Sequence, residues 1–209
     1  DYGKTWKSIA SGLPDEPVNV VKEDPTNENI LYAGGLRGVY ISIDRGNKWS
    51  YLGINMPAAA VADLEIHEAT MDLVVGTHGR GIYKTSLKPI QKMMSQNLSP
   101  TKDYVFEVAT ITRPWFNSSD GEADYRTIER ATFSFWLNES KSLTLSILDK
   151  SNKEIWRTDV TGHKGLNQYR WDLVLSREKS DYPYFIHYDK FIEAGTYVMT
   201  LSTRESSIQ

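Results

Sequence analysis

The chain has 209 residues, of which 40% are hydrophobic and 24% charged, so it can bury the core of one large domain or two small ones. It carries 24 Lys and Arg against 27 Asp and Glu, a net charge of -3, and this balance excludes the basic field that gathers nucleic acid. It has no cysteine, which excludes disulfides, thiolate zinc sites and cysteine nucleophiles. No apolar run approaches the ~20 residues that span a bilayer, so no membrane span is expected.

Residues 1–86 contain a repeat with an offset of 43 residues. Without gaps, this offset superposes several pairs: Asp1 and Asp44, Gly3 and Gly46, Trp6 and Trp49, Arg37 and Arg80, Gly38 and Gly81, and Tyr40 and Tyr83. A period of this length built from short strands is typical of β-propeller blades rather than of helical solenoids.

Four strands are predicted within one period from alternation and from β-branched and aromatic content, at residues 18–23, 30–34, 38–43 and 49–52. Four strands make one blade. We therefore predict about two four-stranded blades over residues 1–86, and an all-β chain. Two blades do not close a ring, so we expect the remaining blades of a parent protein, a second copy or a missing chain as partners.

A turn motif stands between the third and fourth predicted strands, with Ser42, Asp44, Gly46 and Trp49 at fixed spacing. It resembles the Asp-box (BNR) repeat, and Asp1, Gly3 and Trp6 repeat it. A turn Asp accepts hydrogen bonds from nearby backbone N–H groups, Gly permits positive φ, and Trp covers the hairpin. We read the motif as a fold device, with catalysis or metal binding by Asp44 as the weaker alternative. Leu87 stands where a third Asp would fall, which marks the last blade.

The run from Thr77 to Tyr83 resembles the final blade of sortilin-like propellers in proteins often labelled as BNR-repeat glycosyl hydrolases. That resemblance implies a periplasmic, cell-surface or secreted location, with any export signal upstream of Asp1. Arg37 and Arg80 recur at equivalent positions, which favours a structural bridge over a site for an anion or a sugar. His78 lies in a turn flanked by glycine, where a hydrogen-bonded turn histidine is favoured over a ligand-binding one.

Alternation stops over residues 87–103, which we predict to be a linker with a short helix at about residues 90–96. Residues 104–209 contain further strand-like runs: 104–110, 131–137, 143–149, 154–159, 168–174 and 195–202. Such spacing favours a β-sandwich. With Trp171 and the run 194–197, this part is similar to the Ig-like domain of flagellar hook-capping proteins. In that resemblance Trp171 is a core residue.

Two loops of the second part are rich in aromatic residues and include Trp115 and Tyr184. Exposed aromatic side chains stack on sugar rings or anchor partners, whereas buried ones would pack between domains. The packing interpretation is favoured, and the binding one stays open.

The sequence shows no complete active site. Glycoside hydrolysis needs two facing carboxylates, and no spacing singles out such a pair. The four histidines are scattered, so no metal site is predicted, and no cofactor motif is present. We therefore predict a non-catalytic part of a propeller protein that binds polysaccharide or protein. The alternative is one wall of a xyloglucanase-like glycoside hydrolase whose catalytic residues lie mostly upstream.

Overall fold

The computed structural model describes residues 2–52, 56–111, 130–179, 187–203 and 207–208. The chain is 50% strand and 5% helix, with several antiparallel sheets, which confirms the all-β prediction. It divides into two compact units. The first comprises residues 1–103 with 136–140 and 163–167, and the second holds the rest.

The first unit begins with a four-stranded antiparallel sheet in the order β1-β2-β3-β4. Its strands lie close to the four predicted ranges: β1 Val18–Asp24, β2 Asn27–Gly35, β3 Val39–Ser42 and β4 Ser50–Leu52. Tyr32 and Ile41 face each other across β2 and β3, and both are fully buried. Ala33 and Tyr40, the next pair in the register, point to the opposite face of the sheet and form a second cluster with Trp49.

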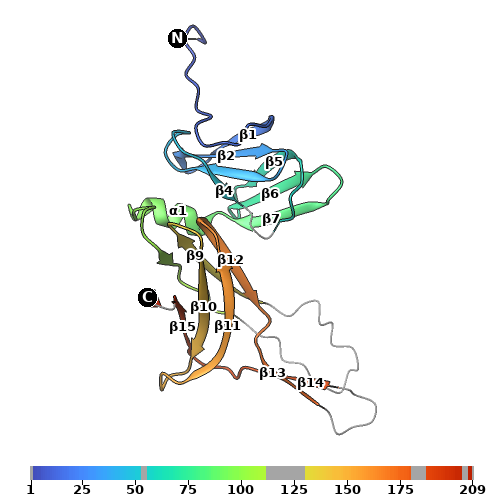
Figure 1. Ribbon diagram of the computed structural model, residues 1–209, viewed down its shortest axis with the longest axis vertical. Helices are drawn as coiled ribbons and strands as arrows, with labels where there is room; N and C mark the ends of the chain where they lie inside the picture. The colour runs from blue at the N-terminus through green and yellow to red at the C-terminus, as the bar shows by residue number, and fades with distance from the viewer. Residues whose placement is uncertain (1, 53–55, 112–129, 180–186, 204–206, 209) are drawn as a thin grey trace. The chain divides into compact units, whose positions relative to one another are not determined.

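A second antiparallel sheet follows beside the first (Figure 1), in the order β5-β6-β7. Its strands are β5 Val61–His67, β6 Asp72–Thr77 and β7 Ile82–Ser86. The two sheets approach closely, because a Cβ added to Gly34 would lie 2.5 Å from the Val61 side chain. Asn19 bridges them as well, donating its side-chain amide to the Val61 carbonyl at 2.8 Å.

The second sheet has three strands among the described residues, where the repeat predicted four. The helix α1, Lys88–Ser95, occupies the segment that the offset places on β4. Pro89 stands in its first turn, where a missing N–H costs no helical bond. Leu87, Ile90 and Met93 are fully buried, so the helix packs on the unit through one apolar face.

Three further antiparallel sheets lie wholly or mostly in the second unit. One has the order β11-β10-β15-β16, from β10 Lys141–Leu148, β11 Glu154–Gly162, β15 Val198–Ser202 and β16 Ser207–Ile208. Another has the order β12-β9-β8, from β8 Tyr104–Val105, β9 Ala131–Leu137 and β12 Gly165–Trp171. The third is the hairpin of β13 Val174–Lys179 and β14 His187–Phe191, which the sequence analysis missed. The strand predicted at residues 104–110 extends only over β8.

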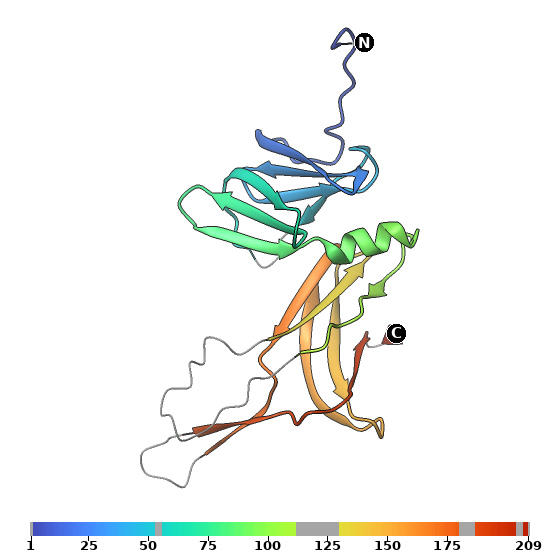
Figure 2. The same ribbon diagram turned by 180° about the vertical axis from the view of Figure 1, so that it is seen from behind.

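Aromatic rings join the two larger sheets of this unit. Trp156 on β11 stacks on Trp171 of β12 with ring centroids 4.5 Å apart, and Phe133 on β9 stacks on the same indole at 6.4 Å. The Trp171 indole is buried and donates to the Val174 carbonyl at 3.0 Å. Trp171 is thus a core residue, as predicted. The strands of this unit are visible from both sides in Figures 1 and 2.

Candidate functional site

A buried carboxylate lies beside the β2–β3 hairpin. Glu16 Oε1 accepts hydrogen bonds from the Tyr40 hydroxyl at 3.1 Å and from the Arg37 backbone N–H at 3.3 Å. The Arg37 Nε atom lies 3.4 Å from Glu16 Oε2, which has no hydrogen bond within the described chain. The Tyr51 hydroxyl donates to the Arg37 carbonyl at 3.3 Å. The cluster therefore ties the loop around Glu16 to the hairpin.

The side chains of this cluster are poorly suited to catalysis. Burial and the hydrogen bond to Glu16 raise the pKa of Tyr40 to about 12, so the phenol stays protonated at neutral pH. Sialidases use a Tyr nucleophile, and other glycosidases use two facing carboxylates. Here Tyr40 is a protonated phenol, and among the described residues the carboxylate bonded to it is Glu16. A structural bridge is the role that the contacts of Arg37 support.

The equivalent hairpin of the second sheet has an alanine at the position of Glu16. The repeat offset places Arg80 on Arg37, but it places Ala59 on Glu16. Arg80 and His78 are exposed, and neither side chain has a hydrogen bond or an ion pair with the described residues. The His78 backbone N–H donates to the Ala60 carbonyl at 2.8 Å, which fixes the backbone and leaves the imidazole free.

Two glycines shape the tip of this hairpin, which connects β6 to β7. Gly79 and Gly81 have φ of 77° and 84°, which L side chains rarely adopt. The Thr77 hydroxyl donates to the Gly81 carbonyl at 2.5 Å and closes the loop. A Cβ at either glycine would meet nothing within 4 Å, so the tip is open to solvent. His78 and Arg80 together offer N–H donors to a ligand that carries negative charge.

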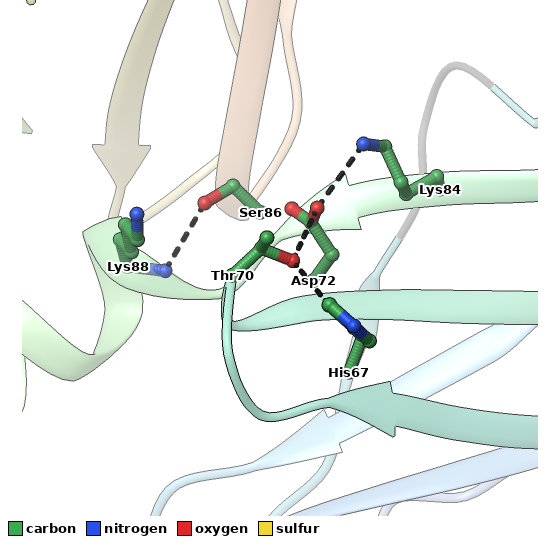
Figure 3. Close-up of polar contacts among 6 residues, drawn as sticks. All are labelled: His67, Thr70, Asp72, Lys84, Ser86 and Lys88. Atoms are coloured by element: carbon green, nitrogen blue, oxygen red, sulfur yellow. Dashed lines mark hydrogen bonds and ion pairs between the residues drawn. The ribbon is translucent and has the colours of Figure 1, made fainter.

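A second polar cluster surrounds Asp72 at the start of β6 (Figure 3). Its Oδ2 atom accepts a hydrogen bond from the Thr70 hydroxyl at 2.8 Å and lies 3.1 Å from Lys84 Nζ. His67 Nδ1 lies 2.9 Å from Thr70 Oγ1. Because the Thr70 hydrogen points to Asp72, we assign the imidazole proton to Nδ1, which donates to Thr70. Lys88 contributes its backbone N–H, which donates to Ser86 Oγ at 3.4 Å.

The pKa of Asp72 reflects these contacts. Burial raises it, but the hydrogen bonds from Thr70 and Lys84 and the charges of Lys84 and Lys88 outweigh burial and lower it overall. The carboxylate is thus ionised, and its Oδ2 atom is bonded to Thr70 of its own turn and to Lys84 on β7. Asp72 holds the β5–β6 connection in place and is a poor proton donor or acceptor for a substrate.

A third network, which the sequence analysis missed, joins the first sheet to α1. Asp24 is buried, and its Oδ2 atom accepts from the Tyr32 hydroxyl at 2.8 Å. Its Oδ1 atom accepts from the Thr26 N–H at 2.9 Å. The Gln91 side-chain amide on α1 reaches both carboxylate oxygens, at 3.2 and 3.0 Å, and also Met71 Sδ at 3.5 Å. The Asp24 carboxylate thereby links the first sheet to the helix, and the Gln91 amide also contacts Met71 in the β5–β6 connection.

The predicted turn motif is occupied by local contacts. Asp44 Oδ1 accepts from the Lys48 N–H at 2.8 Å and from the Ser42 hydroxyl at 2.9 Å. Gly46 has φ of 81° and donates its N–H to Ser42 Oγ at 2.8 Å. The Trp49 indole donates to the Ile9 carbonyl at 2.6 Å. Asp44 therefore accepts one backbone N–H of its own turn, that of Lys48, while Ser42 Oγ accepts that of Gly46.

The other predicted site residues are scattered or lie outside the described residues. Trp6 is exposed and donates to the Gly3 carbonyl at 2.9 Å, whereas Trp49 is buried. Asp1, Trp115 and Tyr184 lie outside the described residues. Within the described part, Arg37 and Arg80 occupy different hairpins, and no group of three His, Asp or Glu side chains would hold a metal ion. Among the described residues, no helix is long and apolar enough to cross a bilayer.

Comparison with known proteins adds no family. No protein-family model matches the chain, and no curated protein or solved structure is significantly similar to it.

Proposed function

We propose that the chain is a non-catalytic β module, the closing blades of an Asp-box propeller followed by an Ig-like sandwich. In this proposal it braces a larger extracytoplasmic protein and binds glycan or protein. The 43-residue repeat and the strands that follow it support the propeller part. The two ring-linked sheets of the second unit support the sandwich.

The observation that carries the non-catalytic proposal is that four carboxylates accept hydrogen bonds from this chain. The clustered acidic side chains are bonded to their own chain: Glu16 to Tyr40, Asp24 to Tyr32 and Gln91, Asp44 to Lys48, and Asp72 to Thr70 and Lys84. Each serves a turn, a loop or a helix. A glycosidase needs two carboxylates free to face one bond, and these four are committed elsewhere.

The binding surface in this proposal is the β6–β7 hairpin tip. Arg80 has lost the acidic partner that Arg37 keeps, and exposed His78 lies two residues away. An exposed guanidinium without a partner among the described residues, two residues from an exposed imidazole, suits a carboxylate or sulfate group. We therefore propose an acidic polysaccharide as the ligand.

Titration of the ¹⁵N-labelled chain tests this. A uronate oligosaccharide should shift the amide resonances of Gly79 and Gly81, and a neutral xyloglucan oligosaccharide should not. The variant Arg80→Ala should lose the shift, and Arg45→Ala, which removes the same charge from another turn, should keep it. Equal shifts in wild type and Arg80→Ala, or no shift with any acidic oligosaccharide, would reject this surface. An acidic peptide that binds better than the uronate would assign the tip to a protein partner.

An activity assay tests the non-catalytic part independently. The chain, incubated with a panel of polysaccharides, should release no reducing sugar. Release above the buffer blank, lost in the variant Glu16→Gln, would overturn the proposal in favour of the glycoside hydrolase alternative.

A further inference from the structure

A pocket of about 400 Å³ lies beside β4 in the first compact unit. This volume falls in the lower part of the range of about 300–1,000 Å³ that small-molecule sites occupy. The described residues that line it come from β4 and its neighbours in sequence and from Ser140, His163 and Lys164, and all of them belong to that one unit. The pocket shares none of these residues with the β6–β7 hairpin tip.

The apolar part of the lining is held in place by contacts within the unit. Trp49 and Met56 are 8% and 7% exposed, and the Trp49 indole donates to the Ile9 carbonyl at 2.6 Å. The partly exposed Tyr51 donates its hydroxyl to the Arg37 carbonyl at 3.3 Å. The two aromatic side chains are therefore fixed before any ligand binds, and they offer an apolar surface against which a ring can pack.

The polar part of the lining comes from a turn whose backbone is fixed by one buried amide. Asn167 is 5% exposed, and its side chain accepts the His163 N–H at 2.9 Å. The same amide donates to the His163 and Gly165 carbonyls at 2.7 and 2.9 Å. The Lys164 N–H donates to Ser140 Oγ at 3.1 Å. The backbone of the turn is thus anchored, and the exposed side chains of His163 and Lys164 border the pocket.

The charge of the lining favours an anion. Lys164 supplies an ammonium group, His163 a ring N–H, and Ser50 and Ser140 hydroxyl groups. The described residues that line the pocket include no Asp or Glu, although the whole chain has a net charge of -3. Burial raises the pKa of Tyr51, so the phenol at the wall of the pocket stays neutral.

We propose that this pocket binds a small molecule that carries a carboxylate on a ring. The carboxylate accepts hydrogen bonds from the Lys164 ammonium and the His163 imidazole, and the ring packs against Trp49 and Tyr51. A sugar acid and an aromatic acid are the two sources of this chemistry. The site does not depend on the acidic polysaccharide proposed for the hairpin tip.

Titration of the ¹⁵N-labelled chain with glucuronate and with benzoate tests the site. At least one of these carboxylates should shift the amide resonances of Ser50 and Lys164 in a saturable way. The neutral counterparts, glucose and benzyl alcohol, should not. The carboxylate with the lower Kd identifies the source as a sugar acid or an aromatic acid. No saturable shift of these amides with either carboxylate, or equal shifts with the neutral counterparts, would overturn the proposal.

Variants separate the pocket from other cationic parts of the surface. Lys164→Ala should weaken binding of the carboxylate about tenfold, the loss expected when one charge-assisted hydrogen bond is removed. Because Lys164 is exposed, this variant should keep the circular dichroism spectrum of wild type. Lys150→Ala removes the same charge from another exposed turn and should keep the wild-type Kd, as should Arg80→Ala at the hairpin tip. An unchanged Kd in Lys164→Ala, or an equal loss in Lys150→Ala, would contradict the assignment.

Discussion

The sheet β1–β4 and the sheet β5–β7 come from one repeat, yet they end differently. In the first, Asp44 forms a polar turn that leads into β4. In the second, Leu87 stands at the equivalent position, is fully buried and precedes α1. The two segments, residues 44–52 and 87–95, share no residue at the repeat offset, so the fourth segment changes from strand to helix together with its whole sequence and not with the turn residue alone.

A second pair of equivalent residues shows the same divergence at the β1–β2 and β5–β6 connections. Asp24 is buried and bonded to Tyr32 and Gln91, whereas its counterpart His67 is exposed and bonded to Thr70. Both sheets connect the two strands in an antiparallel pair, but the side chains at the equivalent positions 24 and 67 make different contacts. The first sheet uses this position to bind the helix that replaces the strand of the second.

The largest effect is expected from restoring the acidic residue at position 87. Leu87→Asp places a carboxylate in a fully buried site, which should cost at least about 4 kcal/mol in the free energy of unfolding. Urea denaturation followed by tryptophan fluorescence measures this cost. Leu87→Met, which keeps the volume, should cost less than about 1.5 kcal/mol. Similar values for the two variants would show that the site accepts the acid as Asp44 is accepted.

A smaller loss is expected from cutting the link between the first sheet and α1. Asp24→Ala leaves the Tyr32 hydroxyl and the Gln91 amide without their shared acceptor, at a cost of about 3 kcal/mol. Hydrogen exchange should show faster opening of α1 in this variant. The control His67→Ala, at the equivalent position, should stay within about 0.5 kcal/mol of wild type. A small cost for Asp24→Ala would mean that the helix is held by apolar packing alone.

Local features of the fold were predictable from the sequence, and contacts between distant residues were not. The alternation of apolar and polar residues located the strands of the first sheet. The Ser, Asp and Gly of the turn motif predicted that Asp44 accepts a backbone N–H of its own turn, as it does from Lys48. The bond between Asp24 and Gln91 spans 67 residues, and that between Glu16 and Tyr40 spans 24, so no local pattern marks them.

Two features had a signal that alternation alone does not reveal. Leu87 and Pro89 together predict a helix start, so the helix in the segment that aligns with β4 was readable from the repeat offset. The offset also places Ala59 on Glu16, which distinguishes the free Arg80 from the paired Arg37. The hairpin of β13 and β14 had no such signal. The aromatic residues on both sides of Tyr188 interrupt the alternation of apolar and polar residues that would predict a strand.

The turn of the first sheet should contribute less than the buried link, because its N–H groups regain water when the acceptor is removed. Asp44→Ala should lower the free energy of unfolding by about 1–2 kcal/mol, measured by urea denaturation. Asp44→Asn keeps an acceptor oxygen for the Lys48 N–H and should lose less. If the two variants lose the same amount, the charge rather than the hydrogen bond is what the turn requires.

The smallest effect is expected at Asp72 and depends on pH. Asp72→Asn gives the second sheet the residue that the first has at the equivalent position, Asn29. Thr70 and Lys84 hold the folded pKa of Asp72 below the unfolded value of 3.8, so the carboxylate stabilises the fold above that pH. The variant should lose about 1 kcal/mol at pH 7, and its difference from wild type should disappear as the pH falls below the folded pKa.

Urea denaturation at a series of pH values measures this difference, with Glu68→Gln, an exposed neighbour in the same connection, as the control that should not change it. A difference that stays constant down to pH values well below 3.8 would mean that the shape of the side chain, rather than its charge, holds the turn. In that case the two sheets would use the same neutral device at the β1–β2 and β5–β6 connections, and the ion pair with Lys84 would be incidental to the fold.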